Sequence, residues 1–211
     1  MLLSTPITIR RALLPVGLAV AALVAPAGAF GAACPKLPTS QAFLKFGDTA
    51  DYTLLPKANF ESGTTGWSLF NARTVAGNET GGVLPGSRSL ALGTGWVSGP
   101  TIVSTPEFCV GTEHPHFRYM LKANGAVGLL ATLISYRTSN GATVQKQVAS
   151  NVSTNLFPGK WKPSELNPLS VRLPISDGQT LRVRILFVTP ASMNGAGYQI
   201  DNVMIDPYRR G

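Results

Sequence analysis

Turn-forming residues divide this chain into short apolar runs, and that division limits the folds it can adopt. The 211 residues include 22 glycines and 16 prolines, yet 44% of the chain is hydrophobic. Only 13% of the residues are charged, against about 25% in an average soluble domain. A long helical protein needs many more charged residues, and a charged disordered chain has far less apolar content. We therefore expect an all-β domain of short strands joined by turns.

Ten runs of strand-like composition follow one another between turn signals. They are Trp67–Val75, Arg88–Leu92, Thr101–Ser104, Glu107–Val110, His116–Lys122, Val127–Thr138, Ala142–Ala149, Ser170–Leu173, Thr180–Thr189 and Gly197–Ile205. The sequence Ser139-Asn140-Gly141 predicts a hairpin between two of them. The proline-rich segment Asn155–Pro168 predicts a long loop.

Alternation along the runs separates a core face from an outer face. The expected core positions are Leu181, Val183, Ile185 and Phe187 in one run and Phe117, Tyr119 and Leu121 in another. Arg118, Arg182 and Arg184 occupy intervening positions. Such alternation predicts an antiparallel, two-sheet β-sandwich in which each sheet packs one face inward.

The first 29 residues are organised like a secretory signal peptide. Arg10 and Arg11 form a positive region, Ala12–Val24 is apolar, and residues 27–29 (Ala-Gly-Ala) are small enough for cleavage. The apolar stretch is shorter than the ~20 residues that a spanning helix needs, and Pro15 interrupts it. We expect export from a bacterial cell by the general or the twin-arginine route and a secreted product; a retained anchor is the alternative.

Three parts of the chain follow from this interpretation: residues 1–29 as the signal peptide, 30–58 as a leader segment, and 59–211 as the β-sandwich domain. The formal net charge of +8 falls to +6 once Arg10 and Arg11 are removed. The bases are scattered, whereas nucleic-acid surfaces cluster them, so we expect no nucleic-acid partner. The charge suits a carbohydrate or an acidic cell-surface polymer. No later apolar stretch is long enough to predict a transmembrane segment.

Two cysteines, Cys34 and Cys109, remain in the mature chain. An even number of cysteines in an exported protein predicts a disulfide, which would attach the leader segment to the domain. The alternative is a lipid on Cys34, although the large aliphatic residue usual three positions upstream of a lipidated cysteine is missing.

Few residues suit catalysis. The only histidines, His114 and His116, stand in a Glu-His-Pro-His sequence, and no Gly-x-Ser-x-Gly motif accompanies them. Two histidines are too few for a metal site, and no pair of acids has a spacing that indicates a glycosidase cleft. We expect no catalytic residues and interpret the two histidines as part of a loop that leads into a strand.

Two motifs at the ends of the β region carry a family resemblance. The first is Asn59-Phe60-Glu61 with Gly66-Trp67, and the second is Ile200-Asp201-Asn202-Val203. Together they resemble galactose-binding-like jelly rolls, especially the carbohydrate-binding modules of families four and nine. The opening motif is one or two residues shorter than its commonest form, and Asn202 stands where the family has a second Asp. The chain also resembles a group of secreted bacterial proteins with no known activity.

The resemblance implies a structural calcium ion. In similar modules an acid in each motif often holds calcium with backbone carbonyls, and here those acids are Glu61 and Asp201. Glu79 is a third candidate ligand. Calcium takes six to eight oxygens, which carboxylates, carbonyls and water can supply. The alternative is that these acids cap turns or pair with arginines. We expect Trp67, directly after a glycine, to fill the core.

A sugar site on such a fold needs flat aromatic rings beside polar groups. The candidates are Trp96, Trp161, Arg118, Arg182, Arg184 and Gln199. The arginines, if they share a sheet face, could bind an acidic glycan bidentately. The sequence thus predicts a non-catalytic module that binds carbohydrate or cell-envelope polymer. The alternatives are an extracellular structural or adhesive protein and, third, a polysaccharide hydrolase or lyase.

Overall fold

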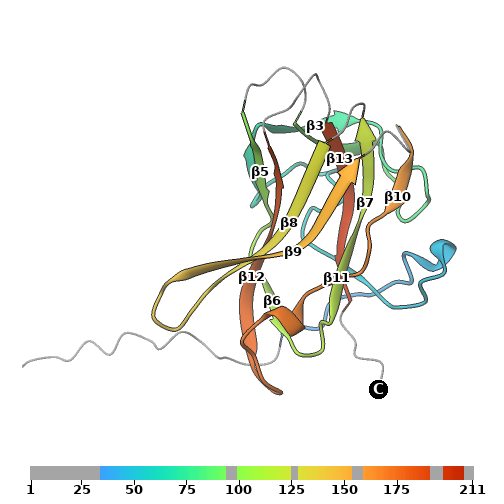
Figure 1. The fold of residues 1–211 in the computed structure, drawn as a ribbon. Helices are drawn as coiled ribbons and strands as arrows, with labels where there is room; N and C mark the ends of the chain where they lie inside the picture. Colours follow the sequence, from blue (N-terminus) through green and yellow to red (C-terminus); the bar gives the residue numbers. More distant parts are fainter. Residues whose placement is uncertain (1–33, 94–98, 125–127, 154–158, 191–196, 207–211) are drawn as a thin grey trace, which may run out of the picture.

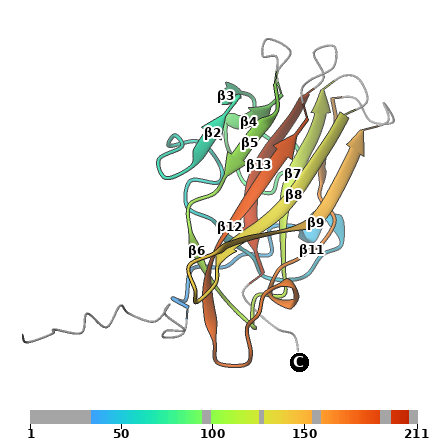
Figure 2. The same ribbon diagram turned by 60° about the vertical axis from the view of Figure 1, so that its left-hand side comes forward.

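Two antiparallel β-sheets packed face to face form the body of the protein (Figures 1 and 2), as the alternation predicts. The computed structural model describes residues 34–93, 99–124, 128–153, 159–190 and 197–206. The expected signal peptide lies outside these residues. Within them, no helix is long and apolar enough to cross a membrane.

One sheet has seven strands. They are β1 (Thr53–Leu54), β3 (Ala72–Ala76), β4 (Arg88–Leu92), β7 (His116–Asn124), β10 (Trp161–Pro163), β11 (Asn167–Pro168) and β13 (Gly197–Ile205). Their order is β10-β7-β13-β4-β3, with β1 paired to β13 and β11 paired to β7.

The other sheet has six strands. They are β2 (Ser68–Phe70), β5 (Thr101–Ser104), β6 (Phe108–Gly111), β8 (Gly128–Arg137), β9 (Thr143–Ser153) and β12 (Thr180–Thr189). Their order is β2-β5-β12-β8-β9, with β6 paired to β12. The chain crosses repeatedly from one sheet to the other, for example from β4 to β5 and from β12 to β13, as in a jelly roll.

The core between the sheets holds the predicted alternate residues. Val183, Ile185 and Phe187 are fully buried, and so are Phe117 and Tyr119. Leu181, near the start of β12, is only partly buried. The hairpin at Ser139-Asn140-Gly141 forms as predicted: it joins β8 to β9, and Gly141 has φ +83°.

Trp67 fills the core, as expected. Its side chain is 8% exposed, and its ring packs edge-on against Phe60 with centroids 5.0 Å apart. The indole Nε1–H donates a 2.9 Å hydrogen bond to the carbonyl of Pro56. The buried indole therefore has the polar partner that such a ring needs.

Three local predictions are wrong. The run Trp67–Val75 is not one strand, because the chain turns at Asn71 (φ 55°) and continues as β3 in the opposite sheet. Ser170–Leu173 has strand-like composition but closes a 3-10 turn, η2 (Ser170–Arg172), in which the N–H of Leu173 bonds the carbonyl of Ser170. The predicted loop Asn155–Pro168 contains β10 and β11, two short pieces paired to β7 that tolerate proline.

Residues 34–58 pack against the seven-stranded sheet, with Phe43 and Tyr52 on its outer face and Leu55 and Ala58 in the main core. They contain η1 (Leu44–Phe46) and β1, and Figure 1 shows this blue-to-cyan segment beside β7, β10 and β11. Phe43 and Tyr52 pack with Val83, Met120 and Met204 in a second, smaller apolar cluster. The predicted disulfide is confirmed: Cys34 is bonded to Cys109 in β6, 75 positions further along the chain. We call residues 34–58 the covering segment.

Candidate functional site

The two end motifs lie side by side in the fold. The N–H of Leu55 donates to the carbonyl of Val203 at 3.0 Å, and the N–H of Val203 donates to the carbonyl of Ala58 at 3.4 Å. Phe60 and Asn202 both have positive φ, at 57° and 50°. A positive φ is unusual for a bulky residue such as Phe60. The junction of the two motifs therefore holds strained backbone at Phe60, which lies before β2, and at Asn202, where the register of β13 against β7 shifts.

The three acids predicted as calcium ligands all accept backbone hydrogen bonds. Glu61 accepts from the N–H groups of Ser87 and Arg88, both at 2.7 Å. The buried Glu79 accepts from three consecutive residues, Gly82, Val83 and Leu84, at 2.6–3.2 Å. Asp201 accepts from the N–H of Glu79 at 3.0 Å. The acids therefore shape the loop between β3 and β4 and fasten it to β13.

The Asp201 carboxyl has a strongly raised pKa. Burial raises its pKa to about 7, and the nearby carboxylates of Glu79 and Glu61 act in the same direction. Beside it, both polar atoms of the buried Asn202 side chain lack a hydrogen-bond partner among the described residues. Carboxylate and amide oxygens of this kind suit calcium. The ligand atoms of Glu61, Glu79 and Asp201 do not gather within 4.8 Å of one another, so the fit rests on Asp201 with Asn202.

The arginines do not share a sheet face, and this prediction was wrong. Arg118 lies in β7 of the seven-stranded sheet, whereas Arg182 and Arg184 lie in β12 of the six-stranded sheet. Arg118 is also occupied: its Nη1 is 2.7 Å from Asp48 Oδ2, its guanidinium donates to the carbonyl of Ser164, and it lies over the ring of Phe43. Arg118 therefore holds the covering segment in place.

Five residues form a row across the outer face of the seven-stranded sheet. Strand register sets them in this order: Trp161 (β10), Lys122 (β7), Gln199 (β13), Ala91 (β4) and Arg73 (β3). Their neighbours Leu121, Tyr198, Ile200 and Leu92 belong to the core, so the row faces outward. Strands about 4.8 Å apart give a row about 19 Å long. We call these five residues the outer row.

The outer row has three polar members, Gln199, Lys122 and Arg73, whereas Ala91 is buried at 2% exposed. The side-chain oxygen Oε1 of Gln199 is buried and has no donor among the described residues. The Lys122 ammonium lies 5.1 Å from the centre of the Trp161 ring, and burial lowers its pKa. Trp161 is half-buried against the smaller apolar cluster, and Arg73 is exposed.

The outer row brings together only two of the predicted sugar-binding residues, Trp161 and Gln199. Trp96 lies outside the described residues. Lys122 and Arg73 are not among the residues that the sequence predicts to bind a ligand. Alternation alone puts Lys122 on the outer face of its run, but Arg73 comes into register only because the chain turns at Asn71.

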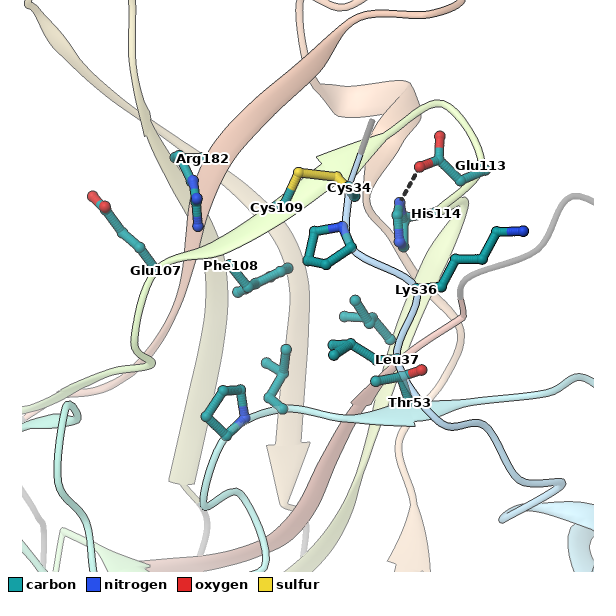
Figure 3. Close-up of a pocket in the computed structure, with 14 residues that line it drawn as sticks. Cys34, Lys36, Leu37, Thr53, Glu107, Phe108, Cys109, Glu113, His114 and Arg182 are labelled. Atoms are coloured by element: carbon teal, nitrogen blue, oxygen red, sulfur yellow. Dashed lines mark ion pairs between the residues drawn. A yellow bond between two sulfur atoms is a disulfide. The ribbon is translucent and has the colours of Figure 1, made fainter. Parts of the chain in front are cut away.

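A pocket of about 450 Å³ lies at the disulfide (Figure 3). The covering segment and β6 supply most of its apolar lining, including Leu37, Leu55 and Phe108. Arg182 and Glu107 lie on one side of the disulfide in Figure 3, and His114 and Glu113 lie on the other. Ligand atoms of Cys34, Glu113 and His114 fall within 4.8 Å of one another, but Cys34 is disulfide-bonded and offers no thiolate to a metal.

Known structures share the sandwich. A scan of protein-family models and a search of curated proteins find no match. Among solved structures, the CBM22-1-GH10 modules of endo-1,4-β-D-xylanase 10B from Clostridium thermocellum, complexed with xylohexaose, align with a TM-score of 0.50 and 15% identity. The alignment covers 75% of this chain and 29% of that one, so this chain spans under a third of that protein's length.

Two further similar structures are single modules. The CBM22-1 xylan-binding domain of Paenibacillus barcinonensis Xyn10C is 19% identical, with a TM-score of 0.47 over 73% of this chain and 94% of that one. The family 11 module of Clostridium thermocellum, in complex with a β-1,3-1,4-mixed-linked tetrasaccharide, is 15% identical, with a TM-score of 0.47 over 76% and 98%. All three of these structures contain carbohydrate-binding modules. At 15% identity and a TM-score of 0.50, the xylanase likeness shows the fold alone.

Proposed function

We propose that this is an exported, extracellular module that binds polysaccharide without catalysis, through the outer row. The main observation behind this proposal is the buried Oε1 of Gln199, at the centre of the row, which has no hydrogen-bond donor among the described residues. A buried acceptor without a partner costs about 1–3 kcal/mol, and a sugar hydroxyl would supply the missing donor. The sandwich shared with a xylanase module that was complexed with xylohexaose supports this proposal. So do the motifs similar to those of families four and nine.

The finer proposal is a preference for acidic polymers. Lys122 and Arg73 place two cations in the outer row, one on each side of Gln199. The Lys122 ammonium is partly desolvated, which strengthens its attraction to a carboxylate. A uronic acid that binds beside Trp161 would meet this ammonium directly.

The test is titration calorimetry with soluble xylan, mixed-linked β-glucan, galactan and polygalacturonate. We expect Gln199→Ala and Trp161→Ala each to weaken binding at least tenfold. Gln145→Ala and Phe70→Ala are the matched controls, because both residues are exposed in the other sheet, and they should leave affinity unchanged. An affinity that Gln199→Ala and Trp161→Ala leave unchanged would refute the site. The absence of binding to all four polymers would refute the function.

We also propose that calcium binds at Asp201 and Asn202. A cation there would neutralise a buried carboxylate whose pKa is raised to about 7, and it would give the Asn202 oxygen a partner. The melting temperature should therefore be higher with calcium than with chelator. Asp201→Asn should abolish that difference. An identical melting curve for the wild-type protein in both solutions would remove calcium from the proposal.

A second candidate function is adhesion to proteins or self-association. It is favoured by Phe70, Ile102 and Leu129, which are 55%, 41% and 39% exposed in the six-stranded sheet. Sedimentation velocity of the wild-type protein and of Phe70→Ser tests this candidate. A concentration-dependent dimer that the substitution dissolves would support it, and a monomer at all concentrations would count against self-association.

A further inference from the structure

The edge strands of the two sheets differ in how well they are protected. The main strand order of the seven-stranded sheet ends in β3, a five-residue strand that carries Arg73, and in β10, a three-residue strand that ends at Pro163. That of the six-stranded sheet ends in β2, with three residues, and in β9. Shortness, charge and proline keep a sheet edge from pairing with another chain. β9 has eleven residues and no proline, so it is the least protected of these four edges.

The outer edge of β9 has backbone groups that no described strand uses. In Figure 2, β9 lies at the margin of the six-stranded sheet, and among the described strands it pairs with β8 alone. Within the described part of the chain, no other hydrogen bond reaches the backbone of residues 143–147. Every second residue of an edge strand directs its N–H and C=O groups away from the strand it pairs with. A further strand could therefore pair along this edge.

A β-bulge limits that pairing to the first part of β9. The register against β8 shifts between Gln147 and Ala149, which leaves Val148 as the extra residue. A bulge bends and twists its strand, so the regular edge consists of residues 143–147. Lys146 is the only charged residue of β9, and its Nζ already donates a 3.0 Å hydrogen bond to the carbonyl of Arg172. The regular edge is therefore short of the charges that would repel an identical strand.

We propose that residues 143–147 pair antiparallel with the same residues of a second copy of this chain, with Gln145 opposite Gln145 of the second copy on a two-fold axis. Such an interface is self-complementary, because each copy offers the other the same edge groups. Centring on Gln145 pairs the whole regular edge and sets Lys146 opposite Val144. Centring on Lys146 would set two ammonium groups opposite each other, which is unfavourable. So short an edge buries less than the roughly 1,200 Å² of a stable interface, so the dimer should form only as the protein concentration rises.

The dimer would present two polysaccharide sites in one direction. A two-fold axis perpendicular to the six-stranded sheet leaves both seven-stranded sheets on the same side of the dimer. The outer rows of the two copies then face the same way. This consequence rests on the proposed function: if the outer row binds polysaccharide, a dimer that binds one polymer surface through both rows should be retained more strongly than a monomer.

The test is sedimentation velocity over a range of protein concentrations, without polysaccharide. We expect a dimer whose fraction rises with concentration. Gln145→Lys and Gln145→Glu each set like charges opposite one another and should weaken the dimer about tenfold. An equal mixture of the two variants should restore it, because opposite charges then face each other. A monomer at every concentration, or a mixture that dimerises no better than the single variants, would overturn the proposal.

The same exchange at Gln147 is the matched control. Gln147 stands opposite Thr143 in the proposed register, so a mixture of Gln147→Lys and Gln147→Glu should dimerise no better than either variant alone. A gain at Gln147 that exceeds the gain at Gln145 would overturn the register centred on Gln145. Phe70→Ser, on the outer face of the same sheet, should leave the dimer unchanged. A dimer that Phe70→Ser dissolves and Gln145→Lys does not would assign self-association to that face.

The dimer and the polysaccharide site can fail independently. Sedimentation without polymer measures the dimer alone, and calorimetry with soluble polymers measures the outer row alone. A dimer without polysaccharide binding would leave the pairing of β9 in place and remove only its consequence for retention.

Discussion

The outer faces of the two sheets differ in what covers them. On the seven-stranded sheet the covering segment buries Met120 and Met204, which alternation alone would leave in water. On the six-stranded sheet the corresponding positions are open: Phe70 is 55% exposed, and Arg182 and Arg184 are exposed. Both sheets have the same alternating pattern, so the difference comes from what packs on the seven-stranded sheet: the covering segment together with Val83 and Leu84 of the β3–β4 loop.

The covered face shows how outward-facing residues acquire structural roles. Arg118 would be a solvated arginine on a bare sheet, but here Asp48, Phe43 and the Ser164 carbonyl surround it. The cover leaves the outer row partly open, and there Gln199 has a buried oxygen without a donor. On the covered face, polar groups are therefore either bonded to the segments that pack on it, as Arg118 is, or without a partner among the described residues, as the Gln199 oxygen is.

The sharpest test of this comparison is a matched pair of phenylalanines. Phe43→Ala removes a fully buried ring from the smaller cluster and should cost about 4 kcal/mol of unfolding free energy. Phe70→Ala, on the open face, should cost less than about 1 kcal/mol, because its ring already meets water. Urea unfolding measures both. Similar losses for the two variants would show that the faces do not differ as described.

The disulfide provides the second test. Replacing both Cys34 and Cys109 by serine releases a cross-link between positions 75 apart, which should cost about 3 kcal/mol of unfolding free energy. The covering segment should also become sensitive to protease before the sandwich does. Limited proteolysis with mass spectrometry checks this order. Simultaneous cleavage of both parts would mean that the segment and the sandwich unfold as one unit.

The third test uses the pH dependence of the covering segment. Burial acts to raise the pKa of Asp48, but hydrogen bonds from Tyr52, the Ala50 N–H and Arg118 outweigh it and lower the pKa overall. The stability that Asp48 contributes is therefore present above its unfolded pKa and is lost as the pH falls through its lower folded value. Asp48→Asn should cost about 2 kcal/mol at pH 7 and little in strong acid.

Two controls belong to the pH experiment. Glu165→Gln replaces an exposed acid outside the covering segment and should leave the acid limb of the stability curve as it is in the wild-type protein. The loss in Asp48→Asn should fade between about pH 4 and pH 2, because the wild-type carboxylate then becomes neutral as well. If Asp48→Asn loses as much unfolding free energy at pH 2 as at pH 7, the effect comes from the shape of the side chain and not from the Asp48 charge.

The sequence predicts features that follow from a local pattern or from a simple count of residues. Alternation in β12 identifies Val183, Ile185 and Phe187 as core, and the cysteine count identifies the disulfide. The covering of Arg118 and the register of Arg73 depend on contacts between distant segments, which no local pattern encodes. The chain turns at one residue with positive φ, Asn71, inside a run of strand-like composition. Composition alone therefore predicts a single strand where the structure has β2 and β3.

The smallest expected effect belongs to the open face. Arg184 and Glu107 are about half exposed, with Nε and Oε1 3.5 Å apart, so their attraction is screened by water and Arg184→Ala should change stability by less than about 0.5 kcal/mol. Arg184 and Lys122 also allow a comparison of two surfaces that could bind an anion. Arg184 lies on the uncovered outer face of the six-stranded sheet, and Lys122 lies in the outer row. If the outer row binds acidic polymer, Lys122→Ala should reduce retention on immobilised polygalacturonate at low salt while Arg184→Ala does not. If instead Arg184→Ala reduces retention and Lys122→Ala does not, the acidic polymer binds the outer face of the six-stranded sheet, and the outer row is a site for neutral sugars.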